Sequence, residues 1–146
     1  MSDAEVEFEL VTSAKQLVAP PPMRTETVIL KEWKSPSGKP FGFKVWEITS
    51  SDYDALIKSG WTFYPDGTRK RYTHEDADIR QLTFTVRDPN GNRLWNSIEE
   101  AKRQLRPLGR SCIDQLVMAS NRVNSVKQED TEGNSDGTTE DSSPTT

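Results

Sequence analysis

Residues 72–124 read YTHEDADIRQLTFTVRDPNGNRLWNSIEEAKRQLRPLGRSCIDQLVMASNRVN, and this stretch decides the fold. Its last third carries the clearest helical periodicity in the chain. Four apolar residues return there to one side of a helix: Ile113, Leu116, Val117 and Val123. We expect this closing helix to form the core and the elements before it to pack on it.

The first third of the stretch fits two structures. Ile79, Leu82 and Val86 have helical spacing, whereas residues 82–86 alternate apolar residues with threonine and favour a strand. A strand would pair across the Asn90–Gly91 turn as a hairpin, because Asn-Gly is a strong hairpin signal. The residues alone leave both structures open.

A short helix is expected after this turn. Asn96 is its expected N-cap, with Glu99 three residues on in the position of a capping box. Its apolar side is formed by one stripe of residues: Ile98, Ala101, Leu105 and Leu108.

Upstream, residues 25–49 predict a β-hairpin. Two runs rich in β-branched and aromatic residues flank the turn sequence of residues 35–40. A lone hairpin is marginal in water, so one of its faces must lie against helices. We expect four aromatic side chains to form that packing face: Trp33, Phe41, Phe43 and Trp46. A short helix should follow, from the cap hydroxyls at Thr49 to the stop at Gly60.

Residues 61–72 form a loop around Pro65-Asp66-Gly67, and two interpretations compete for its aromatic residues. The first interpretation is a loop that stacks bases on its aromatic rings and holds phosphates with Arg69, Lys70 and Arg71. The favoured interpretation is a hairpin-like loop whose aromatics cover the core, because three cations release few counterions.

The two ends of the chain differ from its middle. Residues 1–24 are expected to be a flexible arm, in which Val6, Phe8 and Leu10 alternate with glutamates before three prolines. Such a pattern can form a strand on a partner. Residues 125–146 hold one lysine against six carboxylates, which predicts a disordered acidic tail.

Composition excludes several function classes. Apolar residues make up 32% of the 146 residues, and none of the runs approaches the roughly 18 apolar residues of a membrane span. Cys112 and His74 are the only cysteine and histidine, so we expect neither a metal site nor a cofactor site. No nucleophile or phosphate-binding motif is present, and we expect no enzymatic activity. A net charge of −4 argues against nucleic acid as the main partner.

Several features together resemble one family. Residues 45–49, VWEIT, have the form of a strand that opens a helix, and residues 88–95, DPNGNRLW, combine an Asn-Gly turn with a basic residue and Leu-Trp. A Glu-rich short helix and an apolar helix ending near Asn121 and Asn124 follow. This order, over about residues 25–124, resembles the tail assembly chaperones of long-tailed bacteriophages. The family pattern favours a helix through about Phe84.

The resemblance implies a fold and a role. The expected fold is α+β, with an N-terminal β-hairpin packed on a small bundle of short α-helices over residues 25–124. The implied role is to bind the tape measure protein in the host cytoplasm, keep it soluble, recruit tail-tube subunits and leave before the virion matures. Homo-oligomers and a frameshifted longer form are compatible with this role. The runner-up is a nucleic-acid-binding regulatory phage protein that uses residues 61–72.

The expected binding residues are large aromatics that so small a core cannot bury completely. Clustered exposed aromatics are a solubility cost unless a partner covers them. We expect the exposed set, and hence the partner-binding site, to be Trp61, Phe63, Tyr64 and Trp95.

Overall fold

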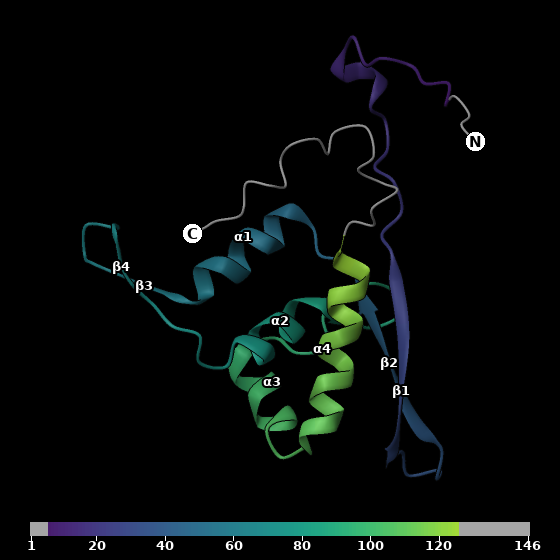
Figure 1. Cartoon of the computed structure of the whole chain (residues 1–146), viewed down its shortest axis with the longest axis vertical. Helices are drawn as coiled ribbons and strands as arrows, with labels where there is room; N and C mark the ends of the chain where they lie inside the picture. The colour runs from purple at the N-terminus through teal and green to yellow at the C-terminus, as the bar shows by residue number, and fades with distance from the viewer. Residues whose placement is uncertain (1–5, 126–146) are drawn as a thin grey trace, which may run out of the picture.

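The computed structural model describes residues 6–125, which form an α+β domain with an extended N-terminal segment (Figure 1). One 3-10 turn, Ala14–Gln16, precedes the domain. The strands are β1 (Thr25–Lys34), β2 (Pro40–Trp46), β3 (Trp61–Phe63), β4 (Arg69–Tyr72) and β5 (Val86–Arg87). The helices are α1 (Ser50–Ser59), α2 (Ala77–Thr85), α3 (Ile98–Leu105) and α4 (Arg110–Asn124).

The expected hairpin of residues 25–49 is confirmed as β1 and β2. These strands pair antiparallel with Val28 opposite Phe43, and β5 joins the far side of β2 with Val86 opposite Val45. The strand order β1-β2-β5 leaves β1 at an edge of the sheet.

The core lies between this sheet and the helices. Alternate residues of the hairpin, including Leu30 and Val45, are fully buried. Helix α4 runs beside both strands of the hairpin and also packs on α2, which in turn carries α3 (Figure 1). The β1–β2 hairpin and helices α2, α3 and α4 therefore share one apolar interior, centred on residues 72–124.

Helix α4 confirms the predicted apolar face. Ile113, Leu116 and Val123 are buried, and Val117 is half-buried against the same cluster. Leu116 has no exposed surface at all and belongs to the same core cluster.

The segment that fitted two structures contains both of them. Helix α2 continues through Thr85, and the chain then extends into β5 at Val86. The threonines that favoured a strand are accommodated in the helix, because the Thr83 hydroxyl donates to the Ile79 carbonyl at 2.7 Å and the Thr85 hydroxyl to the Gln81 carbonyl at 3.0 Å.

One helix start differs from its prediction, and another has an unusual backbone conformation. Helix α3 is capped one residue later than expected, by Ser97, whose hydroxyl accepts from the Glu100 N–H at 3.1 Å. The Glu100 carboxylate in turn accepts from the Asn96 N–H at 2.9 Å. Helix α2 begins after Asp76, whose left-handed backbone (φ 56°) turns the chain into the helix without a side-chain cap.

The predicted ends are only partly within the described residues. Residues 6–24 contain no strand and are exposed except for Arg24, which is half-buried where β1 begins. The predicted disordered tail, residues 125–146, lies outside the described range except for Ser125.

Candidate binding surfaces

The expected loop of residues 61–72 is a small hairpin that projects from the domain (Figure 1). Strands β3 and β4 pair from Trp61 opposite Tyr72 to Phe63 opposite Arg69. The Asp66 carboxylate closes the turn by accepting from the Thr68 N–H at 2.9 Å, and Gly67 takes a left-handed conformation (φ 92°). The hairpin is therefore a defined element that reaches into solvent.

Phe63 and Tyr64 are exposed as predicted, at 41% and 50% of their surface. They do not join the buried cluster, so the interpretation that they cover the core is wrong. Trp61 is half-buried between the Tyr72 ring, with ring centroids 5.2 Å apart, and the Arg69 guanidinium, 4.9 Å from its ring. One face of the indole is thus already occupied by a cation.

The expectation that Trp95 is exposed is wrong. Only 3% of its surface is exposed, and its indole N–H donates to the Gln104 side-chain oxygen at 2.6 Å. The Asn-Gly turn reverses the chain, and the backbones of Arg87 and Arg93 form an antiparallel β-bridge. This reversal places Trp95 against the core beside α3. A hydrogen-bonded N–H makes such burial favourable for tryptophan.

A hollow lies directly above Trp95. Its volume is about 380 Å³, and it is lined by residues of β1, β2, α3 and the segment before α3: Trp33, Phe41, Gly42, Phe43, Leu94, Trp95 and Gln104. The Trp33 and Phe41 rings contact each other edge to face, with their centroids 5.7 Å apart. This is a concave apolar surface with a rigid aromatic wall.

Phe41 and Leu94 are the exposed large apolar residues of this hollow, at 37% and 42% of their surface. Sequence reasoning placed Phe41 on the packing face and gave Leu94 no role. Phe41 does point to the packing face, because it lies opposite the buried Leu30. However, Phe41 is the second residue of β2, and at this first end of the strand it is only partly covered. No sequence signal distinguishes such a position from a buried one.

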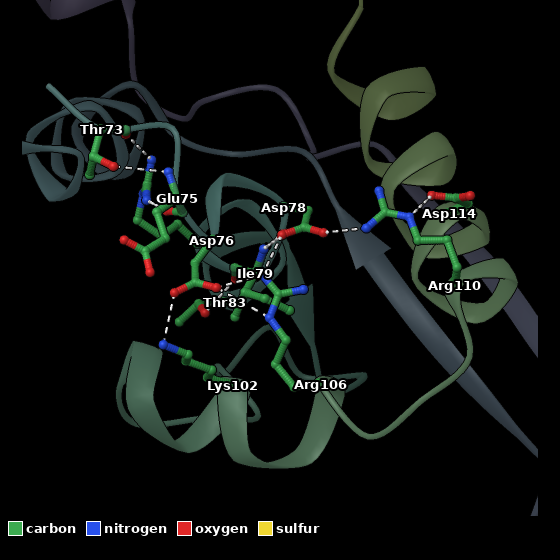
Figure 2. A network of polar contacts seen from close by, with 11 residues as sticks. Thr73, Glu75, Asp76, Asp78, Ile79, Thr83, Lys102, Arg106, Arg110 and Asp114 are labelled. Carbon is green, nitrogen blue, oxygen red and sulfur yellow. Dashed lines mark hydrogen bonds and ion pairs between the residues drawn. The ribbon is translucent and has the colours of Figure 1, made fainter.

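A chain of ion pairs links α2, α3 and α4 on another side of the domain (Figure 2). Asp76 contacts Lys102 at 2.9 Å and accepts from the Arg106 Nε at 3.2 Å. Asp78 joins Arg106 at 3.2 Å to Arg110 at 3.1 Å. The hydrogen bond from Arg106, and then that from Lys102, holds the pKa of the Asp76 carboxyl below its ordinary value of 3.8.

This network fastens helices and offers no reactive group. Beside it, the buried Arg80 guanidinium donates to the carbonyl oxygens of Thr73, at 3.0 Å, and Glu75, which fixes the turn before α2. Within residues 6–125 there is no group of three or more histidine, cysteine or carboxylate side chains placed to hold a metal ion. No described helix is long and apolar enough to cross a membrane.

The lowered pKa of Asp76 predicts acid sensitivity. Because the folded-state pKa is depressed, the stabilisation by the ion pair is complete above pH 3.8 and is lost as pH falls through the lowered value. Urea midpoints measured from pH 6 down to pH 2.5 should fall less steeply for Asp76→Asn than for the natural chain. Parallel pH curves would show that the ion pair does not form.

Comparisons of this chain with protein-family models, with curated proteins and with solved structures found no match.

Proposed function

We propose that this chain is a bacteriophage tail assembly chaperone that binds the tape measure protein, keeps it soluble and recruits tail-tube subunits. The observation that carries the proposal is the aromatic hollow, where Phe41 and Leu94 are exposed around a buried Trp95 floor. A concave apolar surface of this kind suits one large apolar side chain of a partner helix.

The hollow has the composition of a binding hot spot. Its aromatic side chains are rigid and lie next to the core, so a partner side chain entering it would displace water at little cost in protein ordering. Gln104 is the polar residue at its rim, and its side-chain oxygen already accepts from Trp95. Binding would therefore rest on apolar area and depend only weakly on salt.

The β3–β4 hairpin supplies a second contact in this proposal. Phe63 and Tyr64 present apolar area, and the Lys70 ammonium lies 5.7 Å from the Tyr64 ring. An amphipathic helix with acidic residues beside its apolar stripe would match this combination. Trp61 would hold the hairpin in place from its half-buried position.

The proposal is non-enzymatic and needs no cofactor. Binding takes place in the host cytoplasm, and polymerisation of the tail tube on the tape measure protein displaces the chaperone, so it is missing from the mature virion. Each apolar side chain of the tape measure protein that the chaperone releases is then buried again in the growing tail.

The test measures binding of purified full-length chain to synthetic helices from the tape measure protein encoded beside it. Phe41→Ser with Leu94→Ser should weaken binding at least tenfold, and Phe63→Ser with Tyr64→Ser should weaken it less. Tyr53→Ser is the matched control, because Tyr53 is more exposed than Phe41 or Leu94, lies on α1 and lines neither the hollow nor the β3–β4 hairpin. If the control weakens binding as much as the hollow variant does, the assignment of the hollow is wrong.

The nucleic-acid alternative has one observation in its favour. Arg69, Lys70 and Arg71 are all exposed on the projecting hairpin. Retention of the chain on DNA at physiological salt, lost on Arg71→Ser, would favour this alternative. Under the chaperone proposal, the chain should elute from DNA below the physiological salt concentration.

A further inference from the structure

The free edge of β1 is the largest unpaired backbone surface in the described sheet. Strand β1 has ten residues and pairs on one side only. Its central run, Thr27 to Leu30, carries no charge, bulge or proline to oppose a further strand. An edge of this kind is a template for pairing with another chain.

A groove follows this edge. Two adjoining hollows of about 280 and 260 Å³ share Ile29 and Gln115 and lie between β1 and one exposed stripe of α4. The α4 residues of the groove recur at helical spacing: Ser111, Cys112, Gln115, Met118 and Arg122. Met118 is the large apolar residue that α4 contributes to the groove, and it is more than half exposed.

The chain carries a segment with the pattern that this edge requires. Val6, Phe8 and Leu10 are all exposed, and they alternate with Glu7 and Glu9. Alternation sends the three apolar side chains to one face of a strand and the two glutamates to the other. The segment has no strand pairing with any other part of residues 6–125.

The apolar part of the groove sets the orientation. Lys31 and Glu32 are both exposed, line one end of the groove and form no ion pair among the described residues, so their charges offset each other. At the other end, the Glu26 carboxylate accepts from the Arg122 Nε at 3.0 Å. A strand with its apolar side chains over the groove and Met118 turns its glutamates to the opposite face.

We propose that residues 6–11 of one copy add as a strand to the free edge of β1 of a second copy, with Val6, Phe8 and Leu10 in the groove beside α4. A second copy is the fitting source because Figure 1 shows the arm running on past the start of β1, away from its own edge. Pro20, Pro21 and Pro22 stiffen it in that direction. Residues 12–24 reach about 40 Å when extended, which is enough to bridge two domains. Reciprocal exchange gives a two-fold dimer.

The natural chain should behave as a dimer in light scattering under reducing conditions. Replacing Val6, Phe8 and Leu10 by serine should give a monomer that still unfolds cooperatively, because these residues lie outside the core. Replacing Glu7 and Glu9 by serine is the matched control and should retain the dimer. A monomeric natural chain, or a dimer that survives the apolar triple variant, would overturn the proposal.

The single natural cysteine maps the contact, because Cys112 lines the groove. Mild oxidation should give covalent dimers with at least one of Val6→Cys, Phe8→Cys and Leu10→Cys, and with neither Glu7→Cys nor Glu9→Cys. Cross-linking should vanish when Cys112→Ser is added. Equal linking at both sets of positions would overturn the strand geometry. A disulfide within one chain would overturn the assignment to a second copy.

Discussion

Leu116→Ala is expected to destabilise the domain by about 2–5 kcal/mol, because it removes a fully buried side chain from the core cluster and leaves a cavity. Domains of this size have total stabilities of only about 5–15 kcal/mol. The urea midpoint should therefore fall steeply while the slope of the transition is unchanged.

Met118→Ala is the matched control for this prediction, and both replacements are measured in the monomeric variant in which Val6, Phe8 and Leu10 are serine. Met118 lies two residues further along α4 and is more than half exposed, so its replacement should change stability by less than about 0.5 kcal/mol. If Leu116→Ala leaves the urea midpoint as unchanged as the control does, the core is not where we place it.

Trp95→Ala is expected to cost about 3–5 kcal/mol, which makes it the most damaging single replacement outside α4. The indole closes the core between the sheet and α3 and forms the floor of the hollow. Trp95→Phe should cost less, since it keeps part of the packing and loses the 2.6 Å hydrogen bond to the exposed Gln104.

Leu94→Ala distinguishes the binding role of Leu94 from the core role of its neighbour Trp95. Leu94 is the exposed neighbour of Trp95, so its replacement should leave stability within about 1 kcal/mol while weakening partner binding. Equal losses of stability at residues 94 and 95 would contradict the burial of Trp95.

The sequence predicted those parts of the fold that rest on local periodicity. The α4 face and the β1–β2 hairpin follow from spacing, and both are present. The resemblance correctly favoured a helix over residues 79–84, but β5 pairs with β2, far away in sequence, and no local pattern announces such a contact.

The binding surface was harder to predict, because exposure depends on tertiary coverage. Trp95 and Phe41 are both aromatic residues next to turn sequences, yet the chain reversal buries Trp95 while the end of β2 leaves Phe41 partly open. The exposure of Phe63 and Tyr64 was predictable, because a short loop with a Pro-Asp-Gly turn has little core within reach.

The most direct test of the proposed function is the soluble fraction of the tape measure protein when it is produced together with this chain. The account predicts that most of the tape measure protein stays in solution with the natural chain. It should precipitate when Phe41→Ser and Leu94→Ser are combined in a chain that still folds. If the natural chain leaves the tape measure protein as insoluble as an empty vector does, the chaperone assignment is wrong.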